Sequence, residues 1–461
     1  MSHGTLSRRR FLYQSGALAA AGALASGLPI EAFAAPQDTT TLTFWTPGGS
    51  SSYCETLGQV QDAYTKLHPN VRFNKITCGS GTQDFLTVLL ARIAAGNPPD
   101  ATIFWNSPVT LGAQGAAESI DDLMAHSAKS RVKDWPAAVL ESCQFGGKTW
   151  GLPATAGSTA FWYNVDWFAK KGIPTERDKF PKTWDELRKL SKEFTQWKGN
   201  TLVTAGKIPM LGEEPEVMMY VWSALNGGQI YDAHKRAYTI DSEPNVALFE
   251  YMVSWLNEEY KGDLQAVNRS AWWNAYVDPK TNRPGAFPAG KMAIVQQGSW
   301  YLGDFYTVAP TFHRFNFAQF PVGPGGKRTT AGFWPNWLVI PKGTRNKEAA
   351  FGWLDYLGSV GIKSWFASVP DMPANKTVPT LLPSVAVQKQ GRAFAADAMQ
   401  FYYHQLDISI PMWNSPIQSF ANDQLKRASD RIMNKVVKPK QGLAEAQQAC
   451  QAMLKKTLQS A

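Results

Sequence analysis

Tryptophans that stand beside small polar residues are the strongest chemical signal in the sequence, which contains 18 Trp, 15 Tyr and 24 Phe. An indole ring offers a broad apolar face that packs on the C–H face of a pyranose, while neighbouring amides, hydroxyls and carboxylates hydrogen-bond the sugar hydroxyls. Four stretches combine both features: Trp105-Asn106-Ser107, Gly298-Ser299-Trp300-Tyr301, Phe333-Trp334-Pro335-Asn336-Trp337 and Met412-Trp413-Asn414. Any single ring fits core packing equally well, but the four together predict a site for a sugar or polyol.

Motifs for catalysis and metal binding are missing from the sequence. It contains neither G-x-S-x-G nor H-E-x-x-H, no Gly-rich dinucleotide fingerprint, and no metal-ligand spacing among its 6 histidines. Acidic clusters occur at residues 121–122 and 213–216. A glycosidase needs only two carboxylates, which can be distant in sequence, so a secreted carbohydrate-active enzyme stays an alternative. The prediction is a binding protein without catalytic residues, metal or cofactor.

The N-terminus has the pattern of an export signal. Three arginines at residues 8–10 precede a weakly apolar stretch at residues 16–28, and a small-x-small site follows at residues 32–34. The paired arginines before Phe11 resemble the twin-arginine signal. We therefore expect residues 1–34 to be cleaved as a signal peptide and the mature protein to act in the periplasm.

The formal net charge of +9 is spread thinly along the chain. The densest basic run, residues 426–440, spaces its charges by three and four residues, as on the solvated face of a helix. Because the clustered aromatic residues lie elsewhere, the sequence does not predict a nucleic-acid partner.

The cysteines suit an oxidising compartment. Cys54 follows the first expected strand and Cys78 ends the second, so neighbouring parallel strands could bring them together, but the sequence leaves this disulfide open. Cys450 falls on the apolar stripe of an expected helix and is predicted to be a buried thiol.

An α/β framework must position the tryptophan stretches. Strands alternate with helices at the start of the mature chain, at residues 41–45, 57–67, 71–77, 85–95 and 101–105. Such alternation forms parallel sheets, and α/β folds bind ligands at the carboxyl edge of the strands. Ser50, Asp84 and Trp105 fall at or just after the expected strand ends.

Later elements follow the same two periodicities. Thr183 and Glu186 form a capping box that marks the start of one helix. Further helices are expected at residues 218–225, 246–256, 347–357, 384–390, 417–437 and 443–458, and strands at residues 292–295, 315–320 and 337–341.

A set of short motifs runs in a fixed order along nearly the whole mature chain. They are Ala94-Ala-Gly96-Asn-Pro-Pro-Asp100 with Ile103-Phe-Trp105, Gly147-Lys-Thr-Trp-Gly151-Leu-Pro153, Trp162-Tyr-Asn164, Pro181-Lys-Thr-Trp-Asp-Glu-Leu187, Gly290-Lys-Met-Ala-Ile294 with Gly298-Ser-Trp300, and Ile340-Pro-Lys-Gly343 with Glu348-Ala-Ala350. By their shared order the chain resembles the extracellular solute-binding proteins of sugar ABC importers, the family that includes maltodextrin-binding protein.

The resemblance implies an α/β, two-lobed periplasmic-binding-protein fold of type II, with the ligand cleft between discontinuous lobes. The chain would cross between the lobes three times, near residues 156–159, 334–336 and 373–375. The N-terminal lobe would comprise residues 35–157 and 336–372, and the C-terminal lobe residues 158–335 and 373–461. Closure of the lobes around a ligand would present a surface to the membrane permease.

The resemblance also implies ligand contacts. Trp105 matches the stacking tryptophan of the N-terminal lobe and Trp300 that of the C-terminal lobe, while Trp334, Asn336 and Trp337 replace glycines common at the second crossing. With the polar loop residues added, the predicted ligand residues are Ser50, Ser51, Asp84, Trp105, Asn106, Glu216, Trp300, Trp334, Asn336, Trp337 and Trp413.

The sequence therefore predicts a monomeric, non-enzymatic periplasmic receptor. It would deliver a carbohydrate ligand, a mono- to small oligosaccharide or polyol, to the permease subunits of an ABC transporter. A receptor for glycerol 3-phosphate or another anionic sugar derivative is the nearest alternative, which basic residues at the cleft would favour. A structural or adhesive protein would instead bind no small ligand saturably.

Overall fold

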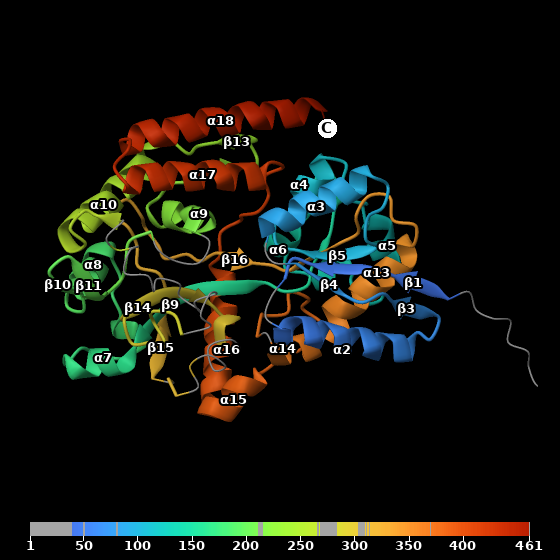
Figure 1. Cartoon of the computed structure of the whole chain (residues 1–461), viewed down its shortest axis with the longest axis horizontal. Helices are drawn as coiled ribbons and strands as arrows, with labels where there is room; N and C mark the ends of the chain where they lie inside the picture. Colours follow the sequence, from blue (N-terminus) through green and yellow to red (C-terminus); the bar gives the residue numbers. More distant parts are fainter. Residues whose placement is uncertain are drawn as a thin grey trace, which may run out of the picture. The chain divides into compact units, whose positions relative to one another are not determined.

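Two β-sheets organise the part of the chain that the computed structural model describes, which is residues 39–48, 51–79, 82–210, 215–264, 267, 284–302, 309, 311–312, 314–368 and 370–460. The predicted signal peptide lies outside these residues, as do Ser50, Glu213 and Glu214. Residues 40–461 form one unit that contains both sheets (Figure 1).

The first sheet has the parallel core that the alternation of strands and helices predicts. Its strands lie in the order β4 (Thr77–Cys78), β2 (Phe44–Thr46), β5 (Ala101–Phe104), β17 (Trp337–Val339) and β8 (Leu152–Pro153). β2 pairs in parallel with β4 and β5, whereas β17 runs antiparallel to β5 and β8. The connecting helices are α2 (Ser51–Leu67) and α3 (Thr82–Ala94).

The first two expected strands are each divided in two. β1 (Thr40–Leu42) is separated from β2 by Thr43, and β3 (Val71–Phe73) is separated from β4 by residues 74–76. The N–H of Thr43 donates to Asp100 Oδ2 at 2.8 Å instead of to a strand partner, so the sheet ladder is interrupted there. β1 and β3 form a small parallel pair of their own.

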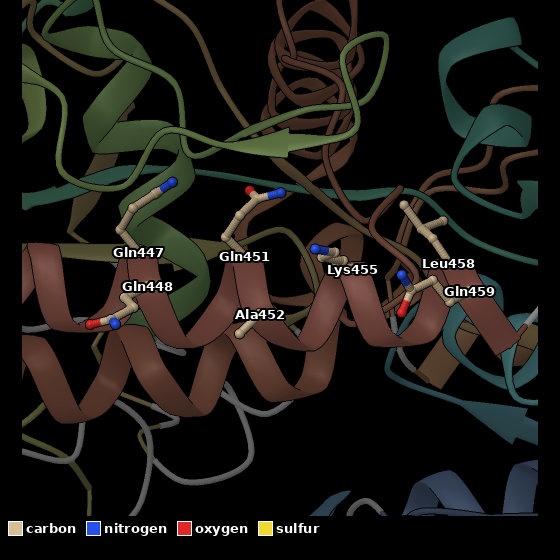
Figure 2. A pocket seen from close by; sticks show the side chains of 7 residues that line it. All are labelled: Gln447, Gln448, Gln451, Ala452, Lys455, Leu458 and Gln459. Atoms are coloured by element: carbon tan, nitrogen blue, oxygen red, sulfur yellow. The ribbon is translucent and has the colours of Figure 1, made fainter.

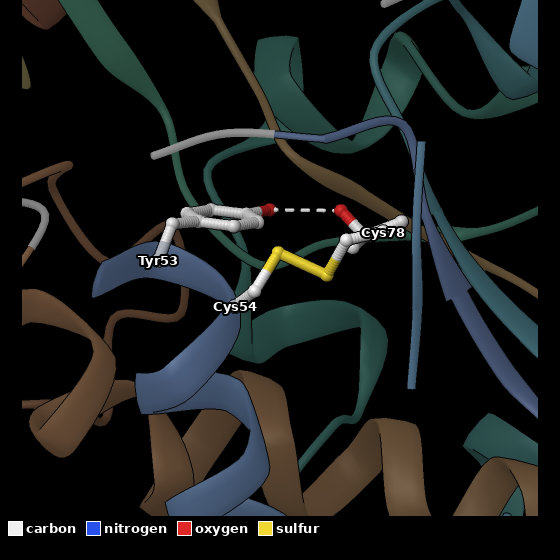
Figure 3. Close-up of a disulfide and its surroundings, with 4 residues drawn as sticks. Tyr53, Cys54 and Cys78 are labelled. Carbon is white, nitrogen blue, oxygen red and sulfur yellow. Dashed lines mark hydrogen bonds between the residues drawn. A yellow bond between two sulfur atoms is a disulfide. The ribbon is translucent and has the colours of Figure 1, made fainter. Parts of the chain in front are cut away.

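A disulfide joins the start of α2 to β4 through Cys54 and Cys78, whose Cα atoms lie 6.5 Å apart (Figure 3). This answers the pairing that the sequence left open. Cys143 and Cys450 are free and buried, and the prediction of a buried thiol at Cys450 is confirmed.

The second sheet is antiparallel and is built around one long strand. β9 (Gly157–Asn164) lies between β14 (Ile294–Gly298) and β15 (Phe315–Ala318), and β16 (Phe333–Trp334) also pairs with its start. All eight residues of β9 are buried, and Trp162 stacks on Phe315 with ring centroids 4.9 Å apart.

Helix α16 (Arg392–Asp407) packs against β9 and was not predicted from the sequence. It begins directly after Gly391, whose φ is +88°, and no side chain caps its first turn. A helix that starts without a capping side chain leaves little start signal in a sequence.

The remaining elements surround the two sheets. The capping box of Thr183 and Glu186 is confirmed at the start of α8 (Trp184–Lys192). The other helices are α4 (Pro108–Ala113), α5 (Asp121–His126), α6 (Ala137–Glu141), α7 (Val165–Lys170), α8 (Trp184–Lys192), α9 (Pro215–Leu225), α10 (Glu243–Glu259), α13 (Lys347–Tyr356), α14 (Ile362–Ser368), α15 (Ser384–Gln390), α17 (Gln418–Met433) and α18 (Pro439–Ser460). Short hairpins pair β6 (Gln144–Phe145) with β7 (Lys148–Thr149), β10 (Gln196–Lys198) with β11 (Thr201–Thr204), and β12 (Tyr231–Asp232) with β13 (Ala237–Tyr238).

The basic run of residues 426–440 lies on α17, the start of α18 and the turn between them, and the two helices lie side by side (Figure 1). Two of its basic residues form exposed ion pairs, Lys426 with Asp430 and Arg431 with Glu445. Within the described part of the chain, no helix has the length and apolar character needed to cross a membrane.

Candidate functional site

Three segments of the chain run next to one another where it passes between the two sheets. Residues 154–156 lead from β8 to β9, residues 335–336 lead from β16 to β17, and residues 371–375 follow α14; we call these the crossing segments. Backbone hydrogen bonds tie them together, from Ala154 N to Asn336 O at 2.8 Å and from Ala156 N to Met372 O at 2.8 Å. The first lies about two residues before the position expected from the sequence.

Trp105 directly follows β5, at the carboxyl end of this strand, and its side chain reaches the second crossing segment. Its half-buried indole donates from Nε1 to Asn336 Oδ1 at 2.8 Å, which fixes the orientation of the ring. The neighbouring Ser107 is buried and caps α4 by accepting from Val109 N at 3.2 Å, so it has a structural role. Asn106 is half-buried.

Asn336 uses its side chain within the protein. Its Nδ2 donates to Thr155 Oγ1 at 2.9 Å and to Asp371 Oδ2 at 2.8 Å, while its Oδ1 accepts from Trp105. Because the residue is only 8% exposed, the geometry assigns it to holding Trp105 instead of contacting a ligand directly.

Asp371 lies on the third crossing segment and was missed by the sequence analysis. Its carboxylate is buried, and this burial raises its pKa to about 7, against the hydrogen bonds of Thr155 and Asn336, which lower it. Among the described residues no hydrogen-bond partner reaches its Oδ1. A lone aspartate between Pro370 and Pro373 carries no motif, and only the unusual placement of a charge at an expected crossing could have drawn attention to it.

Tyr53 is a second residue that the sequence analysis missed. It lies in the first turn of α2 beside the disulfide, and its hydroxyl accepts from Thr46 Oγ1 at 3.4 Å (Figure 3). Burial raises the pKa of Tyr53 far above its ordinary value; the hydrogen bond with Thr46 lowers it, the charge of Asp371 raises it, and a hydrogen bond with Trp105 lowers it. The phenol therefore remains neutral and joins the polar network around Trp105.

Two further tryptophans come from the second sheet. Trp300 follows β14 and is half-buried, with its ring against the backbone of Gly157 and Gly298. Trp334 is also half-buried, pairs with Gly157 through β16, and has its ring centroid 6.2 Å from that of Trp300. Both rings keep surface that a ligand could cover.

The prediction that Trp337 and Trp413 face a ligand does not fit the structure. The two residues are 0% and 1% exposed, and their ring centroids lie 5.3 Å apart. Each indole N–H is bonded internally, Trp337 to Ser142 Oγ at 3.1 Å and Trp413 to Phe333 O at 2.6 Å. Both rings belong to the core because distant partners satisfy their only polar atoms.

The remaining predicted ligand residues are placed only by element. Ser51 begins α2, Asp84 lies in α3 and Glu216 lies in α9, with side chains outside the described part of the structure, and Ser50 lies outside it entirely. The structure thus links Trp105, Asn336, Trp300 and Trp334 of the predicted set. Among the described residues, no group of three His, Cys, Asp or Glu side chains could hold a metal ion.

A hollow of about 620 Å³ lies along α18 and contains none of the predicted ligand residues (Figure 2). Gln447 accepts from Ile240 N at 2.8 Å, and Gln451 accepts from Tyr238 N at 3.0 Å. These glutamines satisfy the backbone of β13 and the residues after it, so they join helix to strand.

Comparison with known families places the chain. The model of the family described as "Bacterial extracellular solute-binding protein" matches residues 51–363, and the chain belongs to this family. The resemblance drawn from the sequence is confirmed.

Individual relatives agree with this assignment. The chain is 27% identical over 295 residues to a probable sugar-binding periplasmic protein of Brucella suis biovar 1, covering 62% of this chain and 63% of the relative. It is 24% identical over 317 residues to the arabinooligosaccharide-binding protein of Bacillus subtilis, covering 68% and 67%.

Solved structures confirm the two-lobed solute-binding fold. The mannotriose-bound structure of CpMnBP1 superposes with a TM-score of 0.71 and 20% sequence identity, over 89% of this chain and 99% of that one. At this identity the likeness establishes the fold.

Proposed function

We propose that this protein is the periplasmic receptor of an ABC importer and that it binds a neutral sugar, from a monosaccharide to a small oligosaccharide, or a polyol. The observation that carries the proposal is the pair of half-buried indoles, Trp105 from the first sheet and Trp300 from the second, on either side of the crossing segments. Rings of this kind stack on the apolar faces of sugars. The carbohydrate ligands of the relatives and of the mannotriose-bound neighbour support the same class of ligand.

The charges near the crossing segments favour a neutral ligand over an anionic one. The described polar side chains of the network that contains Trp105 are hydroxyls, an amide and one carboxylate, from Thr46, Tyr53, Thr155, Asn336 and Asp371. None of them is a lysine or arginine, the side chains that form the strongest pairs with a phosphate or carboxylate. Glycerol 3-phosphate is therefore the weaker candidate.

We assign the lobes as the sequence predicts. The N-terminal lobe comprises residues 35–157 and 336–372, and the C-terminal lobe comprises residues 158–335 and 373–461. The crossing segments then serve as the hinge between them, because few residues connect the two sheets there. Closure brings the two indoles onto the sugar and forms the surface that the permease recognises.

The proposal includes how the protein reaches its place of action. Residues 1–34 direct export by the twin-arginine route and are removed, and the mature protein acts as a monomer that binds no nucleic acid. It releases its ligand unchanged. Incubation with oligosaccharides followed by analysis of the products tests this last point, since any cleavage would identify an enzyme instead.

A thermal-shift screen of the mature protein tests the proposal. Sugars, polyols, sugar acids and glycerol 3-phosphate are each added at about 1 mM, and a ligand that binds only the native state raises the Tm by mass action. We expect shifts from neutral sugars or polyols alone. A shift from glycerol 3-phosphate or sugar acids alone would replace the proposed ligand class with an anionic one.

Matched variants show whether the indoles carry the binding. Trp105→Ala and Trp300→Ala should strongly reduce the shift, whereas Trp197→Ala should retain it. Trp197 is also half-buried, but it lies on β10 with Lys261 4.6 Å from its ring centroid, away from the crossing segments. Equal shifts in all three variants would contradict the proposed site.

A further inference from the structure

Asp371 occupies an unusual position between the two proposed ligand tryptophans. It lies on the third crossing segment, is 5% exposed, and receives hydrogen bonds from the other two crossing segments. Burying a charge costs free energy. A buried carboxylate where the crossing segments meet is therefore expected to have a role beyond packing.

One face of the carboxylate supports Trp105. Asp371 Oδ2 accepts from Asn336 Nδ2 at 2.8 Å, and Asn336 Oδ1 accepts from Trp105 Nε1 at 2.8 Å. A carboxylate can only accept hydrogen bonds, so it forces the amide nitrogen of Asn336 towards itself. The amide oxygen must then point at the indole, which fixes the plane of the ring.

The other oxygen of the carboxylate lies across Gly157 from Trp300. A Cβ at Gly157 would collide with Asp371 Oδ1 and would also lie 2.7 Å from atoms of the Trp300 ring. The carboxylate and the indole therefore border the same space, which only a glycine leaves empty. The side of the Trp300 ring that faces the protein lies over Gly157 and Gly298, and the Asp371 oxygen borders the space at Gly157.

We infer that Asp371 is the common positioning residue for both ligand tryptophans, holding Trp105 through Asn336 and Trp300 across Gly157. The inference rests on the proposed function for its meaning, because the two rings matter only if they stack on a ligand. It adds a residue that no ligand touches but on which the shape of the binding surface depends.

Ionisation of Asp371 gives this arrangement a pH dependence. Hydrogen bonds to an ionised carboxylate are about twice as strong as those to a neutral acceptor, so Asn336 is held more firmly above the pKa of about 7 than below it. The charge of Asp371 acts on the phenol of Tyr53 in α2, which stays neutral in this range. Thr155, Gly157 and Asn336, which the structure places against Asp371 from the other elements, carry no titratable side chain.

The ligand-free protein provides the first test. Mature protein labelled with 5-fluorotryptophan is followed by ¹⁹F NMR from pH 8.5 to 5.5, with the Trp105 and Trp300 signals assigned by their loss in Trp105→Phe and Trp300→Phe. We expect both signals to shift with a common midpoint near pH 7 in the wild type and to stay constant in Asp371→Asn, with Trp197 unaffected in both. Movement of neither signal, or of one alone, would overturn the shared support.

Affinity for the best sugar found in the thermal-shift screen provides the second test. Wild type at pH 8.5 should bind most tightly; wild type at pH 5.5 and Asp371→Asn at either pH should bind about fivefold more weakly, and Asp371→Ala about twentyfold more weakly. Asp371→Asn should not lower the Tm at pH 8.5, because it removes a buried charge. A wild-type pH dependence that persists in Asp371→Asn would contradict the inference.

The two proposals fail in different ways. If no sugar or polyol binds at either pH, the proposed function fails, while the ¹⁹F titration still reports whether Asp371 sets the positions of both rings. If a sugar binds but Asp371→Ala binds it as tightly as the wild type, the proposed function stands and the positioning role is wrong.

Discussion

The two proposed ligand tryptophans are positioned by different interactions, a hydrogen bond for Trp105 and close packing for Trp300. Trp105, at the end of a parallel strand of the first sheet, is oriented by a directional hydrogen bond to Asn336, which is itself bonded to Thr155 and Asp371. The ring of Trp300, in the antiparallel second sheet, lies over two glycines, Gly157 and Gly298, where a side chain would collide with it.

This difference predicts what each ring is sensitive to. A hydrogen-bonded ring depends on the chemistry of its partner, since an unpaired buried donor costs about 1–3 kcal/mol. A ring packed against glycine depends on volume, since added atoms in a tight space cost about 1–3 kcal/mol. Apart from changes at Asp371, which we infer to position both rings, loss of a hydrogen-bonding group should therefore act mainly on Trp105 and added volume mainly on Trp300.

Removing each ring gives the largest expected effect and asks whether the two sheets contribute equally. Trp105→Ala and Trp300→Ala should each cost about 2–4 kcal/mol of sugar binding, the range for buried aromatic hot spots, with little loss of fold. Isothermal titration calorimetry measures the affinity and circular dichroism checks the fold. A variant that binds as the wild type does would show that its ring is structural.

The disulfide is a covalent link within the part of the fold that carries Trp105. It closes a loop of sequence separation 24 and anchors the start of α2, where Tyr53 joins the network around Trp105. Cys54→Ser with Cys78→Ser should lower the free energy of unfolding by about 3 kcal/mol, as loop closure predicts. Denaturant unfolding measures this, and dithiothreitol should lower the stability of the wild type to the same level while leaving the double variant unchanged.

The sequence predicted the features that local patterns encode, but not the contacts between residues far apart in the chain. The strands and helices, and the order of motifs that identified the fold, are local patterns, and so are the indoles of Trp105 and Trp300 beside polar residues. The partner of Thr155 on the third crossing segment lies 216 residues further on, and no local pattern marks it.

Burial explains why the sequence assigned Trp337 and Trp413 wrongly to the ligand site. Trp337 and Trp413 share the local pattern of Trp105, but Ser142 and the Phe333 carbonyl satisfy their N–H groups in the core. Only the assembled fold supplies these partners, so the sequence could not separate a core indole from a ligand-facing one.

A methyl group at Gly157 tests the steric side of the comparison. Gly157→Ala places a Cβ against Asp371 and the Trp300 ring, and should cost about 1–3 kcal/mol of stability together with a loss of sugar affinity. Gly58→Ala is the matched control, because no atom lies within 4 Å of its added Cβ and it sits in α2, where alanine favours the helix. Thermal unfolding and calorimetry of both variants separate a local collision from a general intolerance of alanine. Equal behaviour of the two would show that the space beside Gly157 is not tight.

The smallest expected effect comes from removing one hydroxyl from the network around Trp105. This change can also show which of the two rings the network acts on. Thr155→Val keeps the shape of the side chain but removes the hydroxyl that accepts from Asn336 and bonds Asp371, and it should cost about 1 kcal/mol of sugar binding. A double-mutant cycle then decides where the cost arises, because only groups that share a network depart from additivity. The loss should disappear in a Trp105→Ala background, where there is no ring left to orient, and persist in a Trp300→Ala background. A loss that disappears in both backgrounds would mean that the hydroxyl acts through Asp371 on both rings. Trp105 and Trp300 would then belong to one coupled hinge, and the distinction between a hydrogen-bonded ring and a packed ring would not hold.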